Sequence, residues 1–140
     1  MPPLIFAILG AITFGVWTIF HKLAAPHINQ IFGAIIVSFT AVLVGLAVLL
    51  PRLRAVELVT NRRGIIFTCL AGGAAFLIDF FALKAYAGGL PISVGGPVII
   101  GGSIAVAIVI GFFLGESLSL LKAIGLFSIF AGSAILASFS

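Results

Sequence analysis

The sequence predicts an all-α membrane protein that folds as a bundle of five transmembrane helices. Of its 140 residues, 63% are hydrophobic and only 7% are charged, whereas a soluble domain carries about 25% charged residues. Five apolar stretches are each long enough to cross a hydrocarbon layer of about 30 Å at a rise of about 1.5 Å per residue. Composition and span length together predict the fold class.

The five expected helices follow one another closely and form one transmembrane domain over residues 1–140. Pro26 and Asn29 predict the first turn, and the run Gly88–Pro91 predicts the third. In the last turn, Glu116 and Ser117 suit the positive N-terminal end of the next helix; Glu116 is interpreted as this cap or, alternatively, as a contact of a cytoplasmic gate. We expect the helices at about residues 4–25, 31–50, 64–87, 91–114 and 119–140.

The longest connection, Pro51–Arg63, predicts the orientation in the membrane. It holds four of the seven basic residues, and Lys122 falls on the same side of the membrane. Lys22 and Lys84 fall on the other side. Because cytoplasmic loops are enriched in lysine and arginine, this excess of five over two predicts a multi-pass protein of the cell membrane with a cytoplasmic N-terminus and an external C-terminus.

The fourth expected helix contains proline and glycine in mid-span. No charged residue occurs from Pro91 to Leu114, but Pro97 and Gly101 interrupt the apolar run. Proline removes one backbone donor and clashes with the carbonyl four residues earlier, so a kink or a loosened turn is expected. Lipid does not satisfy freed backbone groups, which predicts that this span lines a polar passage. A kinked helix kept only for packing is the alternative.

Asp79 is the strongest single candidate for a functional residue, because it lies well inside the third expected helix. An ionised side chain there costs about 2.5–3.5 kcal/mol on insertion scales, so it is expected to face the interior and to have a partner. His21 and Lys22 are the nearest candidates, and Lys84 is a poorer one. Asp79 is interpreted as a substrate-contacting or proton-carrying carboxylate; a structural ion pair, or a protonated carboxyl bonded to a neighbouring helix, is the alternative.

One face of the first expected helix is polar for a membrane span. Gly10, Thr13, Trp17, His21 and Ala24 recur at three- and four-residue spacing, which indicates a cavity wall, although a lone histidine near a helix end is more often a bonded or interfacial residue. Trp17 and Asp79 lie at similar depth, about 12 Å from the outer end, and the proline–glycine region lies about 9–15 Å in. The predicted substrate pathway comprises Trp17, His21, Asp79, Pro97 and Gly101.

Two further features are interpreted structurally. In the fifth expected helix, Gly125, Ser128 and Gly132 form a stripe of small residues, which suits close helix approach within or between subunits. Tyr86, near the end of the third expected helix, is interpreted as an interfacial anchor.

Several stretches also follow one known pattern: Gly15-Val16-Trp17, Ala82–Tyr86, Pro97 in mid-span, Leu114-Gly115-Glu116 and Ala131–Leu136. Together they resemble an EamA-like domain, the repeat unit of the drug/metabolite transporter superfamily. The resemblance implies transport of small metabolites. Most members contain two such domains and this chain has one, so a dimer is implied: a homodimer, either antiparallel or parallel, or a heterodimer with a similar short chain. The small multidrug resistance relatives carry a first-span glutamate that is absent here.

The sequence does not contain the motifs that several other classes of protein require. The sequence has no metal-ligand cluster, P-loop or nucleophile elbow, so neither an enzyme nor a cofactor is predicted, and the lone Cys69 excludes an intrachain disulfide. The net charge of +4 is concentrated in one loop and does not indicate nucleic-acid binding. The predicted partners are the lipid bilayer, a small-molecule substrate and a second subunit. A non-transporting assembly or regulatory subunit of the membrane is the alternative function.

Overall fold

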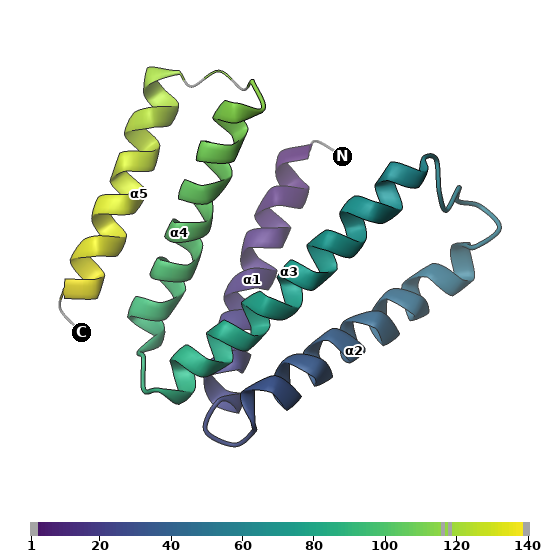
Figure 1. Cartoon of the computed structure of the whole chain (residues 1–140), viewed down its shortest axis with the longest axis horizontal. Coiled ribbons are helices and arrows are strands. Elements are labelled where there is room, and N and C mark those ends of the chain that lie inside the picture. Colours follow the sequence, from purple (N-terminus) through teal and green to yellow (C-terminus); the bar gives the residue numbers. More distant parts are fainter. Residues whose placement is uncertain (1–2, 116, 118, 139–140) are drawn as a thin grey trace. The chain divides into compact units, whose positions relative to one another are not determined.

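The computed structural model describes residues 3–115, 117 and 119–138, and no strand occurs among them. Figure 1 shows the helices, coloured along the chain from the N-terminus to the C-terminus. Each long helix begins and ends within two residues of its expected span. The bounds are α1 Pro3–Ala24, α2 Gln30–Leu49, the short 3-10 helix η1 Leu50–Arg52, α3 Arg62–Ala87, α4 Ile92–Phe113 and α5 Leu120–Ser138.

Within the described residues, four helical segments are long and apolar enough to cross a membrane: Pro3–Ala24, Gln30–Arg52, Arg62–Ala87 and Ile92–Phe113. In α5 the apolar stretch is the shorter segment Ala123–Leu136. Large apolar side chains are exposed along all five helices; Phe67 in α3, for example, is 68% exposed. Such extensive apolar surface is unfavourable in water. It is consistent with a membrane protein whose helices face lipid.

The chain divides into two compact units. The α2–α3 unit spans His21–Ala87 and contains the last turn of α1 with α2 and α3. The α4–α5 unit combines Met1–Phe20 with Gly88–Ser140 and therefore contains most of α1 together with α4 and α5. Each unit carries its own polar feature.

In the α2–α3 unit, α2 and α3 pack side by side and run antiparallel (Figure 1). Their contact depends on small residues, since Ala34 and Ala82 are almost completely buried. A methyl group added at Gly33 would lie 2.7 Å from Leu83 Cδ1. Membrane helices associate through van der Waals contact and not through the hydrophobic effect, so small residues that allow close approach supply the stabilisation.

Both helices of this unit begin at an asparagine. The Asn29 Oδ1 atom accepts hydrogen bonds from the backbone N–H groups of Ile31 and Phe32, over 3.0 and 3.2 Å. The Asn61 Oδ1 atom accepts one from the backbone N–H of Arg63 over 2.9 Å. These side chains satisfy donors that the first turn of a helix leaves without an intrahelical partner, so the asparagines define where α2 and α3 start.

In the α4–α5 unit, α4 is one continuous helix with Pro97 inside it. The sequence led us to expect a kink or a loosened turn here; the helix is continuous from Ile92 to Phe113, and a bend of its axis at Pro97 stays a prediction. Pro97 is the sixth residue of α4, so the only acceptor that loses its usual donor is the Ser93 carbonyl, four residues earlier. One missing hydrogen bond near the start of a helix leaves the following turns intact.

Candidate functional site

His21 and Asp79 form a buried pair in the α2–α3 unit. The Nε2 atom of His21 lies 3.1 Å from Oδ1 of Asp79, and the two residues are 3% and 7% exposed. His21 comes from the last turn of α1, and Asp79 lies in the C-terminal half of α3. The expectation that Asp79 is buried beside a partner is confirmed, and His21 is one of the two nearest candidates that the sequence offered.

The same unit contains two contacts between a basic group and an aromatic ring. Lys22 Nζ lies 5.8 Å from the centroid of the Tyr86 ring, and Lys84 Nζ lies 5.8 Å from that of Phe80, both within the range of a cation–π contact. Tyr86 is only 1% exposed, so its interpretation as an interfacial anchor is wrong. An anchor must contact headgroups or interfacial water, whereas the Tyr86 ring is enclosed by the protein.

The Tyr86 hydroxyl has no hydrogen-bond partner within the described residues, although it is buried. A buried hydroxyl without a partner is unfavourable by about 1–3 kcal/mol. Such groups are rare in folded proteins and usually bind water or serve a function. The hydroxyl therefore marks a place in the α2–α3 unit where a water molecule or a polar solute group would be stabilised.

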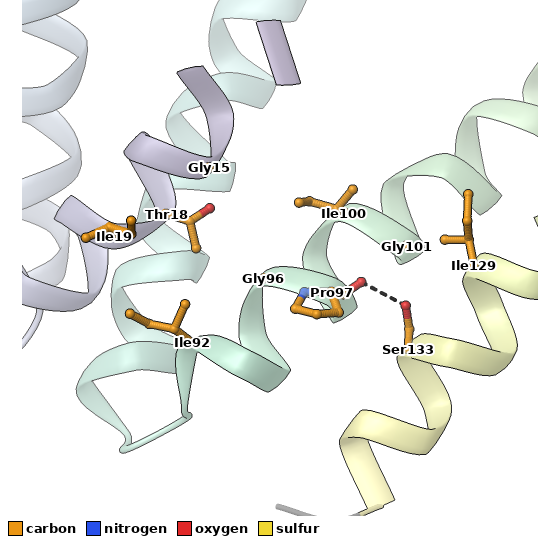
Figure 2. Close-up of a pocket in the computed structure, with 10 residues that line it drawn as sticks. All are labelled: Gly15, Thr18, Ile19, Ile92, Gly96, Pro97, Ile100, Gly101, Ile129 and Ser133. Atoms are coloured by element: carbon orange, nitrogen blue, oxygen red, sulfur yellow. Dashed lines mark hydrogen bonds between the residues drawn. The ribbon is translucent and has the colours of Figure 1, made fainter. Parts of the chain in front are cut away.

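The α4–α5 unit contains a hollow of about 420 Å³ (Figure 2). Thr18 from α1 and Ile100 from α4 point into the same space. Its polar groups are few: the Thr18 hydroxyl donates to the Phe14 carbonyl over 3.0 Å, and the Ser133 hydroxyl donates to the Pro97 carbonyl over 3.1 Å. The lining residues are Gly15, Thr18, Ile19, Ile92, Gly96, Pro97, Ile100, Gly101, Ile129 and Ser133.

Pro97 and Gly101, both predicted to line a passage, lie on the wall of this hollow. At Gly101 the helices α4 and α5 also approach closely, because a methyl group added there would lie 2.6 Å from Ser133 Oγ and 3.4 Å from Ser133 Cβ. The packing alternative for the proline–glycine region is therefore supported as well: the same residues border a hollow and hold two helices together.

The predicted pathway residues fall into two groups. His21 and Asp79 belong to the α2–α3 unit, whereas Trp17, Pro97 and Gly101 belong to the α4–α5 unit. Trp17 is half-buried and its ring centroid lies 4.8 Å from that of Phe14. Trp17 is not one of the residues that line the hollow.

The small-residue stripe of α5 is open in the single chain. Methyl groups added at Gly125 or Gly132 would meet no described atom within 4 Å, and Ser128 is exposed, with its hydroxyl bonded to the Ile124 carbonyl of its own helix. The described contact of α5 with α4 instead uses Ser133. Packing of this stripe between subunits therefore stays a prediction, as does the role of Glu116, which lies outside the described residues.

Thr18 and Ser133 were not singled out by the sequence. Thr18 is 4% exposed and lies three residues before His21, so the spacing that marks a shared helix face pointed to it. Ser133 lies in Ala131–Leu136, a stretch that contributed to the family resemblance without an assigned role. Serine and threonine hydroxyls often donate to a carbonyl of their own helix, so residue type alone does not identify Thr18 and Ser133 as residues of a site.

These observations define a class: an all-helical chain with apolar helices of membrane-spanning length and a buried carboxylate–imidazole pair. Within the described residues, no group of three or more histidine, cysteine, aspartate and glutamate side chains is placed to hold a metal ion. No protein-family model, curated protein or solved structure matches the chain.

Proposed function

We propose that this chain is one half of a secondary transporter for small metabolites, of the drug/metabolite transporter type that its sequence resembles. The observation that carries the proposal is the His21–Asp79 pair, buried between helices in a chain that is otherwise apolar. Ionisable groups in membrane helices are rare, and they mark substrate and ion pathways more often than they support the fold alone. In this proposal the chain lies in the cell membrane with its N-terminus in the cytoplasm.

The pair supplies a binding chemistry for a positively charged group. His21 holds Asp79 in the empty site, and a solute ammonium group or a proton competes with the imidazole for the carboxylate. Cationic and zwitterionic solutes are thus favoured over bare anions. In this proposal Trp17, Pro97 and Gly101 contribute the part of the substrate pathway that belongs to the α4–α5 unit, supported by the hollow that Pro97 and Gly101 border.

A dimer completes the transporter in this proposal. Transporters of this kind form the substrate site between two repeats and alternate access by moving one against the other, and this chain has one repeat. The open stripe of Gly125, Ser128 and Gly132 supports a helix contact between subunits. The arginine excess argues for one orientation, which favours a similar short partner chain over an antiparallel homodimer. A C-terminal reporter active on both sides of the membrane would reverse that preference.

The proposal is tested by solute flux into vesicles that contain the purified protein. Vesicles are screened with amino acids, sugars and polyamines. We expect Asp79→Asn to abolish the flux that the native protein supports, because it removes the charge for which the solute competes. Glu57→Gln is the matched control, since Glu57 is an exposed carboxylate of the same unit, and it is expected to transport normally. Equal flux by native protein and Asp79→Asn would refute the proposed mechanism.

The open stripe of α5 also favours a second candidate, a membrane assembly or regulatory subunit that does not transport. In that case the native protein supports no flux with any solute class. Replacement of Gly125 and Gly132 by leucine would then abolish co-purification of the partner while leaving the His21–Asp79 pair intact. Flux that survives these replacements would exclude a role limited to assembly.

A further inference from the structure

The loop that joins α2 to α3 is strongly basic, and we propose that it binds the headgroup of an anionic phospholipid. The inference does not depend on the proposed transport function. Residues 51–63 contain four arginines and one glutamate, a net charge of +3 in a chain whose total is +4. All residues of this loop are exposed.

The lengths of the two flanking helices indicate that the loop lies at a membrane surface. The segments Gln30–Arg52 and Arg62–Ala87 are both long and apolar enough to cross a membrane, and α2 and α3 run antiparallel (Figure 1). The connection between two such helices is held where the hydrocarbon layer ends, at the level of the phosphates. Its side chains therefore meet lipid headgroups first.

The four arginines are available for phosphate. Within the described residues the carboxylates are Glu57 and Asp79, and no salt bridge joins either of them to Arg52, Arg54, Arg62 or Arg63. The planar guanidinium group binds a phosphate through two parallel hydrogen bonds, which an ammonium group does not reproduce. Anionic lipids supply both the phosphate and the net negative charge that the loop lacks.

Apolar residues lie between the arginines in the same loop. Leu53, Val56, Leu58 and Val59 are exposed, and the Leu58 residue reaches 61% exposure. Basic and apolar side chains mixed on one short segment are typical of structures that lie in the membrane interface, where apolar groups enter the acyl boundary and cations stay with the headgroups. An acidic peptide in water would complement the arginines but would leave these apolar groups exposed.

A hollow of about 510 Å³ is lined by residues that lie before and after Arg62 and Arg63 in the sequence. The lining residues that precede Arg62 in the sequence are Leu58–Asn61. Those that follow Arg63 are Gly64–Ile65, Thr68 and Cys69. Thr60 and Asn61 are polar where the loop enters α3, whereas Ile65 and Cys69 are apolar further along the helix. Leu58 and Val59 add apolar wall at the loop end, and the Thr68 hydroxyl is bonded to the Gly64 carbonyl. The hollow thus offers polar and apolar contacts together, as a lipid headgroup with its acyl chains requires.

The lone cysteine provides the test, because Cys69 is exposed and lines this hollow. The rate of alkylation of Cys69 by N-ethylmaleimide is measured in detergent micelles with added phosphatidylglycerol or phosphatidylcholine. A bound lipid shields the thiol. We expect phosphatidylglycerol to halve the alkylation rate at a concentration at least about fivefold lower than phosphatidylcholine does. An affinity ratio of about fivefold is what one basic residue contributes near an anionic surface.

Paired variants locate the effect. Arg62→Gln combined with Arg63→Gln is expected to reduce the lipid preference by at least about fivefold, whereas Lys84→Gln, at the other end of α3, leaves it unchanged. If the glutamine variant does not fold, the native protein in high salt provides the same comparison, and native mass spectrometry counts the retained lipids. Equal protection by the two lipids, or a preference that survives both the glutamine variant and high salt, overturns the proposal.

Discussion

The Ser133 hydroxyl donates a hydrogen bond to the Pro97 carbonyl over 3.1 Å, from a position 36 residues away in the chain (Figure 2). This bond joins α5 to α4 at the turn that contains the proline. Gly101 makes the bond geometrically accessible, because it has no side chain to separate Ser133 from the backbone of α4. An interhelical hydrogen bond of this kind contributes about 0.6–2 kcal/mol in a membrane protein.

Gly101→Ala is therefore expected to displace the Ser133 hydroxyl from the Pro97 carbonyl and to destabilise the protein by about 1–2 kcal/mol. Gly102→Ala is the matched control, since a methyl group there meets no described atom within 4 Å. Unfolding in detergent by added sodium dodecyl sulfate, followed by circular dichroism, measures the difference. Because Gly101→Ala and Ser133→Ala remove the same bond, their combined effect should be smaller than the sum. Strict additivity would contradict this explanation.

Gly33→Ala is expected to destabilise the α2–α3 contact by about 1–3 kcal/mol. The added methyl group would lie 2.7 Å from Leu83 Cδ1 and 3.2 Å from Ile28 Cγ2, so both neighbours must move. Gly45→Ala, in the same helix but with open space around it, controls for the higher helix propensity of alanine. The same unfolding assay reports both, and Leu83→Val in the Gly33→Ala background should recover part of the loss.

Asp79→Ala and His21→Ala are each expected to reduce stability by about 1–3 kcal/mol, because each leaves the other buried side chain without its partner at 3.1 Å. The double variant removes both groups, so its loss should fall short of the sum by about 0.5–3 kcal/mol. A double-mutant cycle in detergent measures this coupling energy. A coupling near zero would mean that the two side chains are neighbours without a stabilising interaction.

Tyr86→Phe is expected to leave stability unchanged or to raise it by about 1 kcal/mol, because the buried hydroxyl has no hydrogen-bond partner within the described residues. The ring and its contact with Lys22 remain. Thermal unfolding of the two proteins in the same detergent makes the comparison. If the variant is instead less stable, the hydroxyl binds a water molecule in the native protein, and reduced solute flux would identify it as part of the transport site.

The sequence by itself determined the helical class, the places where the helices begin and end, and the need of Asp79 for a partner. These are local properties: hydropathy over about 20 residues selects a span, asparagine and proline mark its ends, and an isolated charge in an apolar helix is unfavourable wherever that helix lies. Among the candidates that the sequence offered for Asp79, the fold places His21 Nε2 3.1 Å from the Asp79 carboxylate.

Only the tertiary structure decided which face of each helix is buried. It placed Tyr86 inside the α2–α3 unit, brought Gly33 against Leu83, and joined Ser133 to Pro97. In a soluble helix the contrast between apolar and polar residues identifies the buried face. Here both the packed face and the exposed face are apolar, since lipid tails are as apolar as the helices themselves. Shape complementarity between distant small residues, which no local pattern records, therefore determines how these helices pack.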